Sequence, residues 1–207
     1  EDGRPELSSI IVEAGTPGYH AKEMHGKMMW RASNTSELYF DDCRVPKENL
    51  LGERGNGFQQ MMQTLDGGRL SIAAMGLGGA QGCFEMALRY SNEREQFGRA
   101  ISNFQINAFK LADMHAAIEG SRLLCYKAAH LKDQGISFSK ESAVAKLVAS
   151  QTAMDVADEA IQIHGGFGYV TEYHVERMLR DAKITQIYEG TSEIQRLVIA
   201  REILKSI

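Results

Sequence analysis

The 207-residue chain contains few cysteines, and their positions fit no covalent framework. Cys43, Cys83 and Cys125 are odd in number, lie far apart in the sequence, and include no Cys-x-x-Cys pair. This spacing argues against a disulfide scaffold and against a structural zinc site. We therefore predict three free thiols in a reducing compartment, either the cytoplasm or the mitochondrial matrix.

Long apolar runs and clustered charge are also missing. No stretch of about 18 apolar residues occurs and the first ten residues are polar, so we expect neither a membrane span nor a signal peptide. The 23 Lys and Arg residues are spread along the chain against 27 Asp and Glu residues, which gives a net charge of -4. This balance does not favour nucleic acid as a partner. The 43% of hydrophobic residues can form a substantial core.

The N-terminal segment has β character. Residues 8–13 are rich in β-branched side chains and precede a turn cluster at 15–18, and residues 35–42 predict a second strand. Two or three strands do not enclose a core of their own. We therefore expect partner strands upstream of residue 1, so that the chain begins within a domain.

The rest of the chain has helical periodicity. Residues 56–93 predict a short helix followed by a long one, interrupted by glycines at 67, 68, 76, 78, 79 and 82. These glycines indicate either a close helix crossing or a locally irregular helix, since each costs about 1 kcal/mol relative to Ala. Further helices are predicted at 104–133, 139–164, 175–183 and 192–205. The fold class is therefore mainly α, with an antiparallel helix bundle.

One carboxylate stands apart from the helical charges. Glu189 follows two apolar residues and precedes Gly190, which turns freely, and Thr191 and Ser192, which are good helix N-caps. A carboxylate just before a helix N-terminus is favoured electrostatically and can act as a general base. The simpler alternative is a surface Glu beside a cap.

The helix that starts near Ser192 has a predicted buried stripe. Its apolar members are Ile194, Leu197, Val198 and Leu204, and the residues expected to be more exposed are Gln195, Arg196 and Lys205.

Two interruptions between helices carry candidate ligand contacts. Arg94 lies four residues before Gly98, and the next helix opens near Gln105, so a guanidinium and helix N–H groups could meet a phosphate. The alternative is an ordinary surface Arg at a helix end.

The other interruption, residues 162–169, contains three glycines that permit the backbone to approach a ligand closely. The segment follows a helix, whereas a dinucleotide-binding fingerprint follows a strand. His164 lacks companions at ligand spacing, so we expect no metal.

Together these segments resemble the acyl-CoA dehydrogenases over the whole chain. The resemblance rests on Cys43-Arg-Val-Pro46, Asp66-Gly-Gly-Arg69, Arg94 to Gly98 with Gln105, Gln162 to Gly166, Arg180-Asp-Ala-Lys183 and Tyr188 to Arg196, in the family's order. Members have an N-terminal helical domain, a middle β domain and a C-terminal four-helix domain. Residues 1–52 resemble the tail of the β-barrel-like middle domain, and residues 53–207 resemble the C-terminal helical bundle.

The resemblance implies an activity and its base. It implies α,β-dehydrogenation of an acyl-CoA thioester to the trans-2-enoyl-CoA, with Glu189 as α-proton acceptor and hydride transfer to N5 of FAD. In the family the N–H of this residue also helps to bind the thioester carbonyl. Members acting on isovaleryl or long-chain thioesters carry the base on a different helix, so Glu189 implies short or medium straight chains.

The resemblance also implies contacts. Arg94 and Gln105 would reach the FAD of a neighbouring subunit. The backbone lining of that same flavin would be Gln162, Ile163, His164, Gly165 and Gly166. Near the adenosine half of the cofactor would lie Thr191, Ser192 and Glu193. For acyl-CoA the implied contacts are Asp66, Arg69, Gly190 and Arg201.

The implied partners are an electron-transferring flavoprotein as acceptor and further copies in a homotetramer or dimer. Two alternatives remain open at this stage. One is a flavin oxidase or nitroalkane-type enzyme of the same fold, and the other is a non-catalytic helical assembly module.

Overall fold

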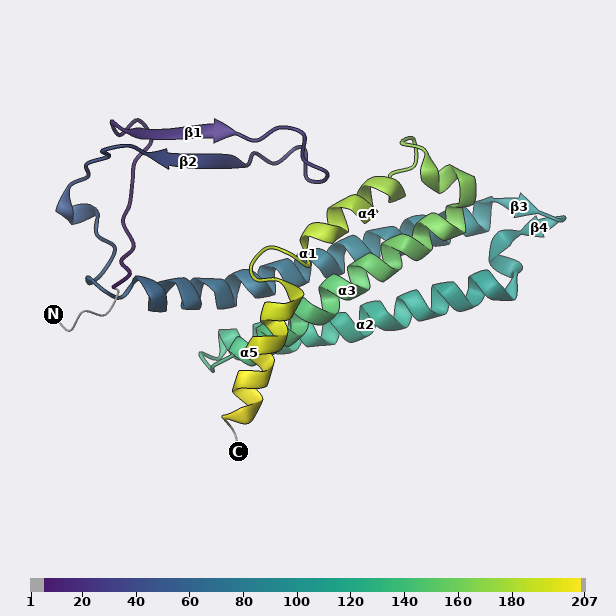
Figure 1. Cartoon of the computed structure of the whole chain (residues 1–207). Coiled ribbons are helices and arrows are strands. Elements are labelled where there is room, and N and C mark those ends of the chain that lie inside the picture. Colours follow the sequence, from purple (N-terminus) through teal and green to yellow (C-terminus); the bar gives the residue numbers. More distant parts are fainter. Residues whose placement is uncertain (1–5, 206–207) are drawn as a thin grey trace. The chain divides into compact units, whose positions relative to one another are not determined.

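The computed structural model describes residues 6–205. Contacts within the chain divide it into two compact units, Glu1–Leu65 and Asp66–Ile207. The first unit holds the strands of one small sheet and the second holds most of the helices (Figure 1). The unit boundary falls inside the first long helix, and the predicted domain division at residues 52 and 53 stays a prediction.

The sheet of the first unit differs from the predicted one. Its strands are β1 (Tyr19–Glu23) and β2 (Ser36–Phe40), which pair antiparallel with Tyr19 opposite Phe40. The strand predicted at 35–42 is confirmed, but the one predicted at 8–13 is wrong, because that segment forms only an isolated bridge from Ile10 to Leu50. A β-branched run becomes a strand only where a neighbour pairs with it along its length.

The helix α1 (Gly57–Glu93) is continuous over 37 residues, so the predicted break into two helices is wrong. No proline interrupts it, and the cost of its glycines is small compared with helix packing. At Gly76 an added Cβ would lie 3.1 Å from the carbonyl oxygen of Ala149 on α3 (Ser139–His164). The close helix crossing, one of the two interpretations left open by the sequence, is therefore present at Gly76.

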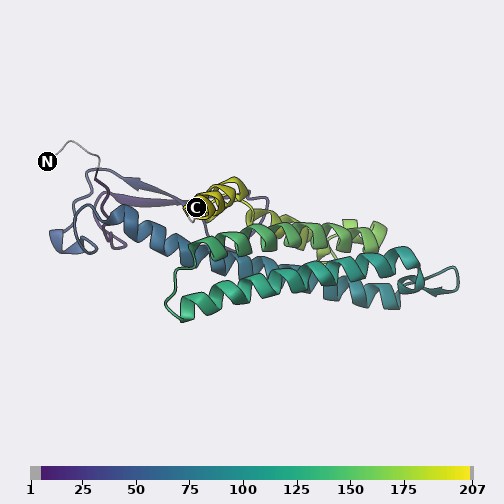
Figure 2. The ribbon, with the colours of Figure 1, turned by 90° about the horizontal axis from the view of Figure 1, so that it is seen from below.

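The remaining helices agree with prediction. They are α2 (Gln105–Asp133), α3, α4 (Val175–Ile184) and α5 (Ser192–Leu204). The second half of α1 runs alongside α2 and α3 in both views (Figures 1 and 2), and α3 also contacts α4 and α5. Small buried residues such as Ala80, Ala149 and Ala157 allow this close approach, with Ile118 and Val156 filling the core.

The connection from α1 to α2 contains a hairpin that the sequence did not predict. The strands β3 (Glu95–Gln96) and β4 (Arg99–Ala100) pair across Phe97 and Gly98, both of which have positive φ, at 52° and 77°. Two consecutive positive φ values are typical of a type I′ hairpin turn.

In the part of the chain from residue 6 to 205, no helix has the length and apolar character that a membrane crossing requires.

The buried face of α5 is not the predicted stripe. Val198 is buried as expected, but Ile194, Leu197 and Leu204 are 43, 65 and 68% exposed, whereas Gln195 is fully buried. Residues 195 and 198 lie one turn apart on the side that packs against α3. The periodicity of apolar residues predicted the wrong face. Gln195 can be buried because its amide finds hydrogen-bond partners in the preceding turn.

Candidate active site

Glu189 lies on a strained turn between α4 and α5. Its φ is 55°, a left-handed value that few non-glycine residues adopt, and Gly190 follows with a φ of 90°. The turn is closed by the Ser192 N–H, which donates to the Gln186 carbonyl at 3.1 Å. Such strain persists only where surrounding contacts determine the conformation.

The Glu189 side chain lies against a glycine of α1. An ideal Cβ built on Gly68 would sit 2.7 Å from the carboxyl carbon of Glu189 and even closer to one of its oxygens. The carboxylate therefore occupies the space that a side chain at residue 68 would fill. The adjacent Tyr188 hydroxyl bonds Met75 Sδ on the same helix at 3.3 Å, and burial, with the Glu189 charge second, raises the pKa of Tyr188 to about 12.

Two buried polar side chains bind the backbone of this turn. Lys146 Nζ donates to the Gly190 carbonyl at 2.6 Å, and Gln195 Nε2 donates to the carbonyls of Gly190 at 2.8 Å and Glu189 at 3.2 Å. Burial, with the Arg69 charge second, lowers the pKa of Lys146 to about 8. The carboxylates of Glu189 and Glu193 act in the opposite direction.

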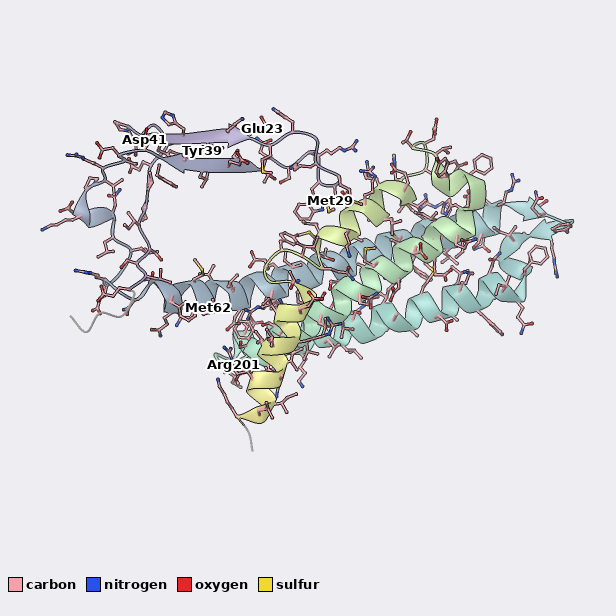
Figure 3. All side chains as sticks on the ribbon, in the orientation of Figure 1. Glu23, Met29, Tyr39, Asp41, Met62 and Arg201 are labelled. Carbon is pink, nitrogen blue, oxygen red and sulfur yellow. The ribbon has the colours of Figure 1, made fainter. Side chains whose placement is uncertain are left out.

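Of the predicted acyl-CoA contacts, Gly190 lies in the Glu189 turn itself, and the others fall at two further places. Asp66 and Arg69 lie on the same stretch of α1 as Gly68, where the nearly buried Arg69 pairs with the Asp66 carboxylate. That carboxylate also accepts a hydrogen bond from Ser139 Oγ at 2.9 Å. Arg201 is exposed in the second half of α5 and pairs with Glu202 (Figure 3).

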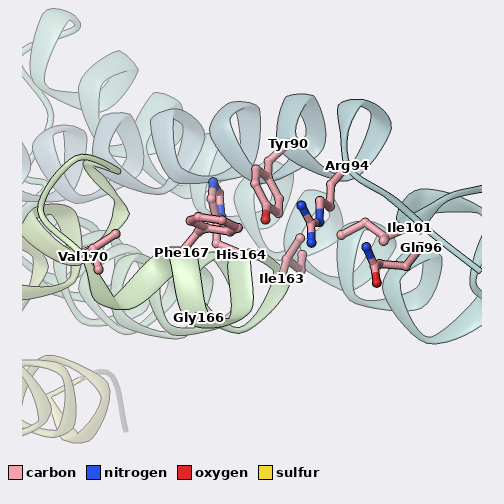
Figure 4. A pocket seen from close by; sticks show the side chains of 9 residues that line it. All are labelled: Tyr90, Arg94, Gln96, Ile101, Ile163, His164, Gly166, Phe167 and Val170. Carbon is pink, nitrogen blue, oxygen red and sulfur yellow. The ribbon is translucent and has the colours of Figure 1, made fainter.

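A cavity of about 450 Å³ lies at the other end of the helices. Figure 4 shows the side chains of its lining residues: Tyr90, Arg94, Gln96, Ile101, Ile163, His164, Gly166, Phe167 and Val170. Tyr90 stacks on His164 with ring centroids 4.2 Å apart, and the Arg94 guanidinium lies 5.6 Å from the Phe167 centroid. The volume is in the range of small-molecule sites.

His164 forms part of this cavity wall and is buried. Its Nδ1 donates to the Ala160 carbonyl at 2.7 Å, and burial lowers its pKa despite that hydrogen bond. Among residues 6–205 no cluster of three His, Cys, Asp or Glu side chains is suited to hold a metal ion.

Comparison with known proteins identifies the family. The family model described as "Acyl-CoA dehydrogenase, C-terminal domain" matches residues 55–204. The chain belongs to the acyl-CoA dehydrogenase family. It is 54% identical over 205 residues to the "Probable acyl-CoA dehydrogenase YngJ" of Bacillus subtilis (strain 168), covering 99% of this chain and 54% of that protein.

Solved structures agree with this assignment. The structure of butyryl-CoA dehydrogenase from Megasphaera elsdenii superposes with a TM-score of 0.93 at 50% identity, covering 95% of this chain and 51% of that one. A structure described as the electron transferring flavoprotein of Acidaminococcus fermentans has a TM-score of 0.94 at 51% identity, covering 95% of this chain and 52% of that one. The chain therefore spans about half the length of these acyl-CoA dehydrogenase relatives.

The structure brings some of the predicted FAD contacts of this chain together and leaves others apart. Arg94, Ile163, His164 and Gly166 line the cavity, whereas Gln105 is exposed at the start of α2. Gln162 and Gly165 adjoin the lining residues in sequence and are exposed at the end of α3.

Thr191, Ser192 and Glu193 form a separate group at the N-terminus of α5. The pKa of Glu193 is lowered, first by its own backbone N–H and then by the Thr191 hydroxyl.

Several residues of the cavity and of the Glu189 turn were not predicted from the sequence. In the cavity these include Tyr90 and Phe167, and at the turn they are Lys146 and Gln195. Tyr90 could have been found, because it lies four residues before Arg94 and therefore on the same helix face. Lys146 and Gln195 carry no such local signal.

The cavity has the chemistry that part of a flavin dinucleotide needs. Its aromatic and apolar side chains can cover a flat ring, and the Arg94 guanidinium supplies a cation that suits a phosphate. The Gly166 backbone, which carries no side chain, adds room for close approach. The residues present therefore fit FAD.

Proposed function

We propose that this chain is the C-terminal part of an FAD-dependent acyl-CoA dehydrogenase. Residues 1–52 would be the end of its middle β domain and residues 53–207 its helical domain. The reaction is the α,β-dehydrogenation of a short- or medium-chain acyl-CoA thioester to the trans-2-enoyl-CoA. The observation that carries this proposal is the Glu189 carboxylate, held by a strained turn against Gly68 of α1.

Glu189 serves as the acceptor of the α-proton. A carboxylate at a fixed place, backed by helix backbone rather than by a mobile side chain, is pre-organised for proton transfer. In residues 6–205 the Glu189 N–H donates no hydrogen bond, so this donor is available for the thioester carbonyl oxygen. One residue thus supplies both the base and a donor that stabilises the developing enolate.

FAD supplies the acceptor for the β-hydride. Arg94 and the backbone of residues 162–166 would hold part of a neighbouring subunit's FAD at the cavity, and Thr191, Ser192 and Glu193 would contact the adenosine half of the cofactor. Gln105 would contact the same FAD as Arg94, since the two residues flank the β3–β4 hairpin, one on each side.

Two partners complete the proposal. An electron-transferring flavoprotein would accept the electrons, which the similarity to the Acidaminococcus fermentans structure supports. A homotetramer or dimer would cover the exposed apolar side chains on α2, among them Ile106, Phe109, Leu123 and Tyr126.

The test is a spectrum of the full-length protein before and after anaerobic addition of acyl-CoA thioesters of graded length. We expect a yellow protein whose oxidised flavin band bleaches most with short or medium straight chains. Rapid reoxidation of the reduced flavin by oxygen would favour the oxidase instead. A colourless protein that binds no acyl-CoA would favour the assembly module.

Arg94→Lys in the full-length protein should weaken flavin retention and assembly. Lysine keeps the charge but loses the planar fork that binds a pyrophosphate through two hydrogen bonds. We expect a lower flavin-to-protein ratio after dialysis and a smaller oligomer mass. The matched control is Arg99→Lys on the same hairpin, where the guanidinium packs on Phe104 at 4.2 Å. Equal flavin content in both variants would reduce Arg94 to a surface cation.

A further inference from the structure

We propose that Lys146 of α3 and Gln195 of α5 are positioning residues that hold the Glu189 turn in its catalytic geometry. The proposal rests on the function proposed above and concerns the backbone beneath the base. Neither residue belongs to the predicted site, but both side chains donate to the backbone carbonyl of Gly190, one of the predicted acyl-CoA contacts.

Both side chains are fully buried, and their polar groups are directed at this one turn. Lys146 and Gln195 have no exposed area, which is unusual for a lysine and an amide. Their hydrogen bonds converge on two consecutive carbonyls, with Gly190 O accepting from both and Glu189 O from Gln195. Burying a polar group without a hydrogen-bond partner costs free energy. Each side chain therefore stabilises the turn, and the turn carbonyls supply the hydrogen-bond acceptors that each buried side chain needs.

The orientation of the Gln195 amide shows which of its bonds matter. Its Oε1 is buried and has no hydrogen-bond partner among residues 6–205, while its Nε2 serves both carbonyls. An amide directed mainly at core packing would not need to leave an acceptor unpaired. The amide therefore directs its N–H donors at the turn and leaves its oxygen atom unpaired.

The charges around Lys146 support the same positioning role. Arg69 on α1 disfavours its protonated form, and Glu189 in the turn and Glu193 on α5 favour it. The hydrogen bond of the ammonium nevertheless goes to a backbone carbonyl of the turn. Lys146 is therefore placed to hold backbone, with the carboxylate of the base as a nearby counter-charge.

The backbone that these donors hold determines where the base lies. Glu189 has a φ of 55° and Gly190 a φ of 90°, values that place the Glu189 side chain against Gly68. If the carbonyls lose their donors, the turn can relax toward commoner backbone angles and carry the carboxylate away. A displacement of about 1 Å can cost roughly 10²-fold in rate.

The experiment uses the full-length holoenzyme with Gln195→Leu and Lys146→Met, which remove the donors but keep apolar bulk. We expect anaerobic flavin bleaching at saturating acyl-CoA to slow by about 10-fold or more in each, with the Kd for acyl-CoA within about threefold of the parent. If Gln195→Leu fails to fold, Gln195→Met, which keeps the side-chain length, takes its place, and if Lys146→Met fails, Lys146→Gln takes its place. The matched control is Ser121→Ala, which loses the buried 2.9 Å hydrogen bond to Thr152 between α2 and α3. It should cost stability without slowing the bleaching.

A double variant separates positioning from a general loss of stability. If Gln195 acts through the place of the carboxylate, then adding Gln195→Leu to Glu189→Gln should slow bleaching little further. Independent losses that multiply in the double variant would overturn the proposal, as would parent rates in the single variants. A parent rate in Glu189→Gln itself would instead overturn the proposed function, so the two failures are distinguishable.

Discussion

Glu189→Gln in the full-length enzyme is expected to slow bleaching of the flavin by acyl-CoA about 10²- to 10⁴-fold, which is the usual contribution of a general base. The amide keeps the shape of the side chain and the backbone N–H but cannot accept the α-proton. Flavin content and acyl-CoA affinity should therefore change little. The measurement is anaerobic stopped-flow decay of the oxidised flavin band at saturating substrate.

The control for this prediction is Glu193→Gln, four residues along the chain. The Glu193 side chain is 78% exposed on the first turn of α5, and its pKa is lowered by hydrogen bonds from its own N–H and from Thr191. We expect this variant to reduce flavin affinity more than the rate of bleaching. If Glu193→Gln is the slower of the two, Glu189 is not the base.

Gly68→Ala is expected to slow the same reaction by about 10- to 10²-fold with little loss of stability. The new methyl group would overlap the present position of the Glu189 carboxylate, which would have to move. The move is cheap in energy because the colliding atoms are the end of a flexible side chain, and alanine favours the helix by about 1 kcal/mol. Catalysis should suffer because the base no longer lies where the turn places it.

Gly78→Ala on the same helix is the matched control for this effect. A Cβ at residue 78 would meet no atom within 4 Å, so this variant should gain helix stability at an unchanged rate. Thermal unfolding and stopped-flow bleaching, measured on both variants, separate the two effects. Parent-like bleaching in Gly68→Ala would mean that catalysis does not require the carboxylate to lie against α1.

The candidate base could be found from the sequence because its signals are local. An apolar pair, a glycine and two capping residues in succession predict a turn before a helix, and the structure has both, with α5 beginning at Ser192. Neighbouring residues determine such features, so the chain needs no distant partner to specify them. The contact of the carboxylate with Gly68, 121 positions earlier, had no local signal.

The sequence by itself determined the mainly α fold, the limits of α2 to α5 and the turn at Glu189, since helix periodicity and capping act over a few residues. Tertiary structure decided which segments pair and which polar groups are buried. The β-branched run at 8–13 lacks a partner along its length, α1 continues through its glycines because it packs on α3, and Gln195 is buried because the turn supplies its acceptors. Each of these outcomes depends on a hydrogen-bonding or packing partner outside the local pattern, and only the folded chain brings those partners together.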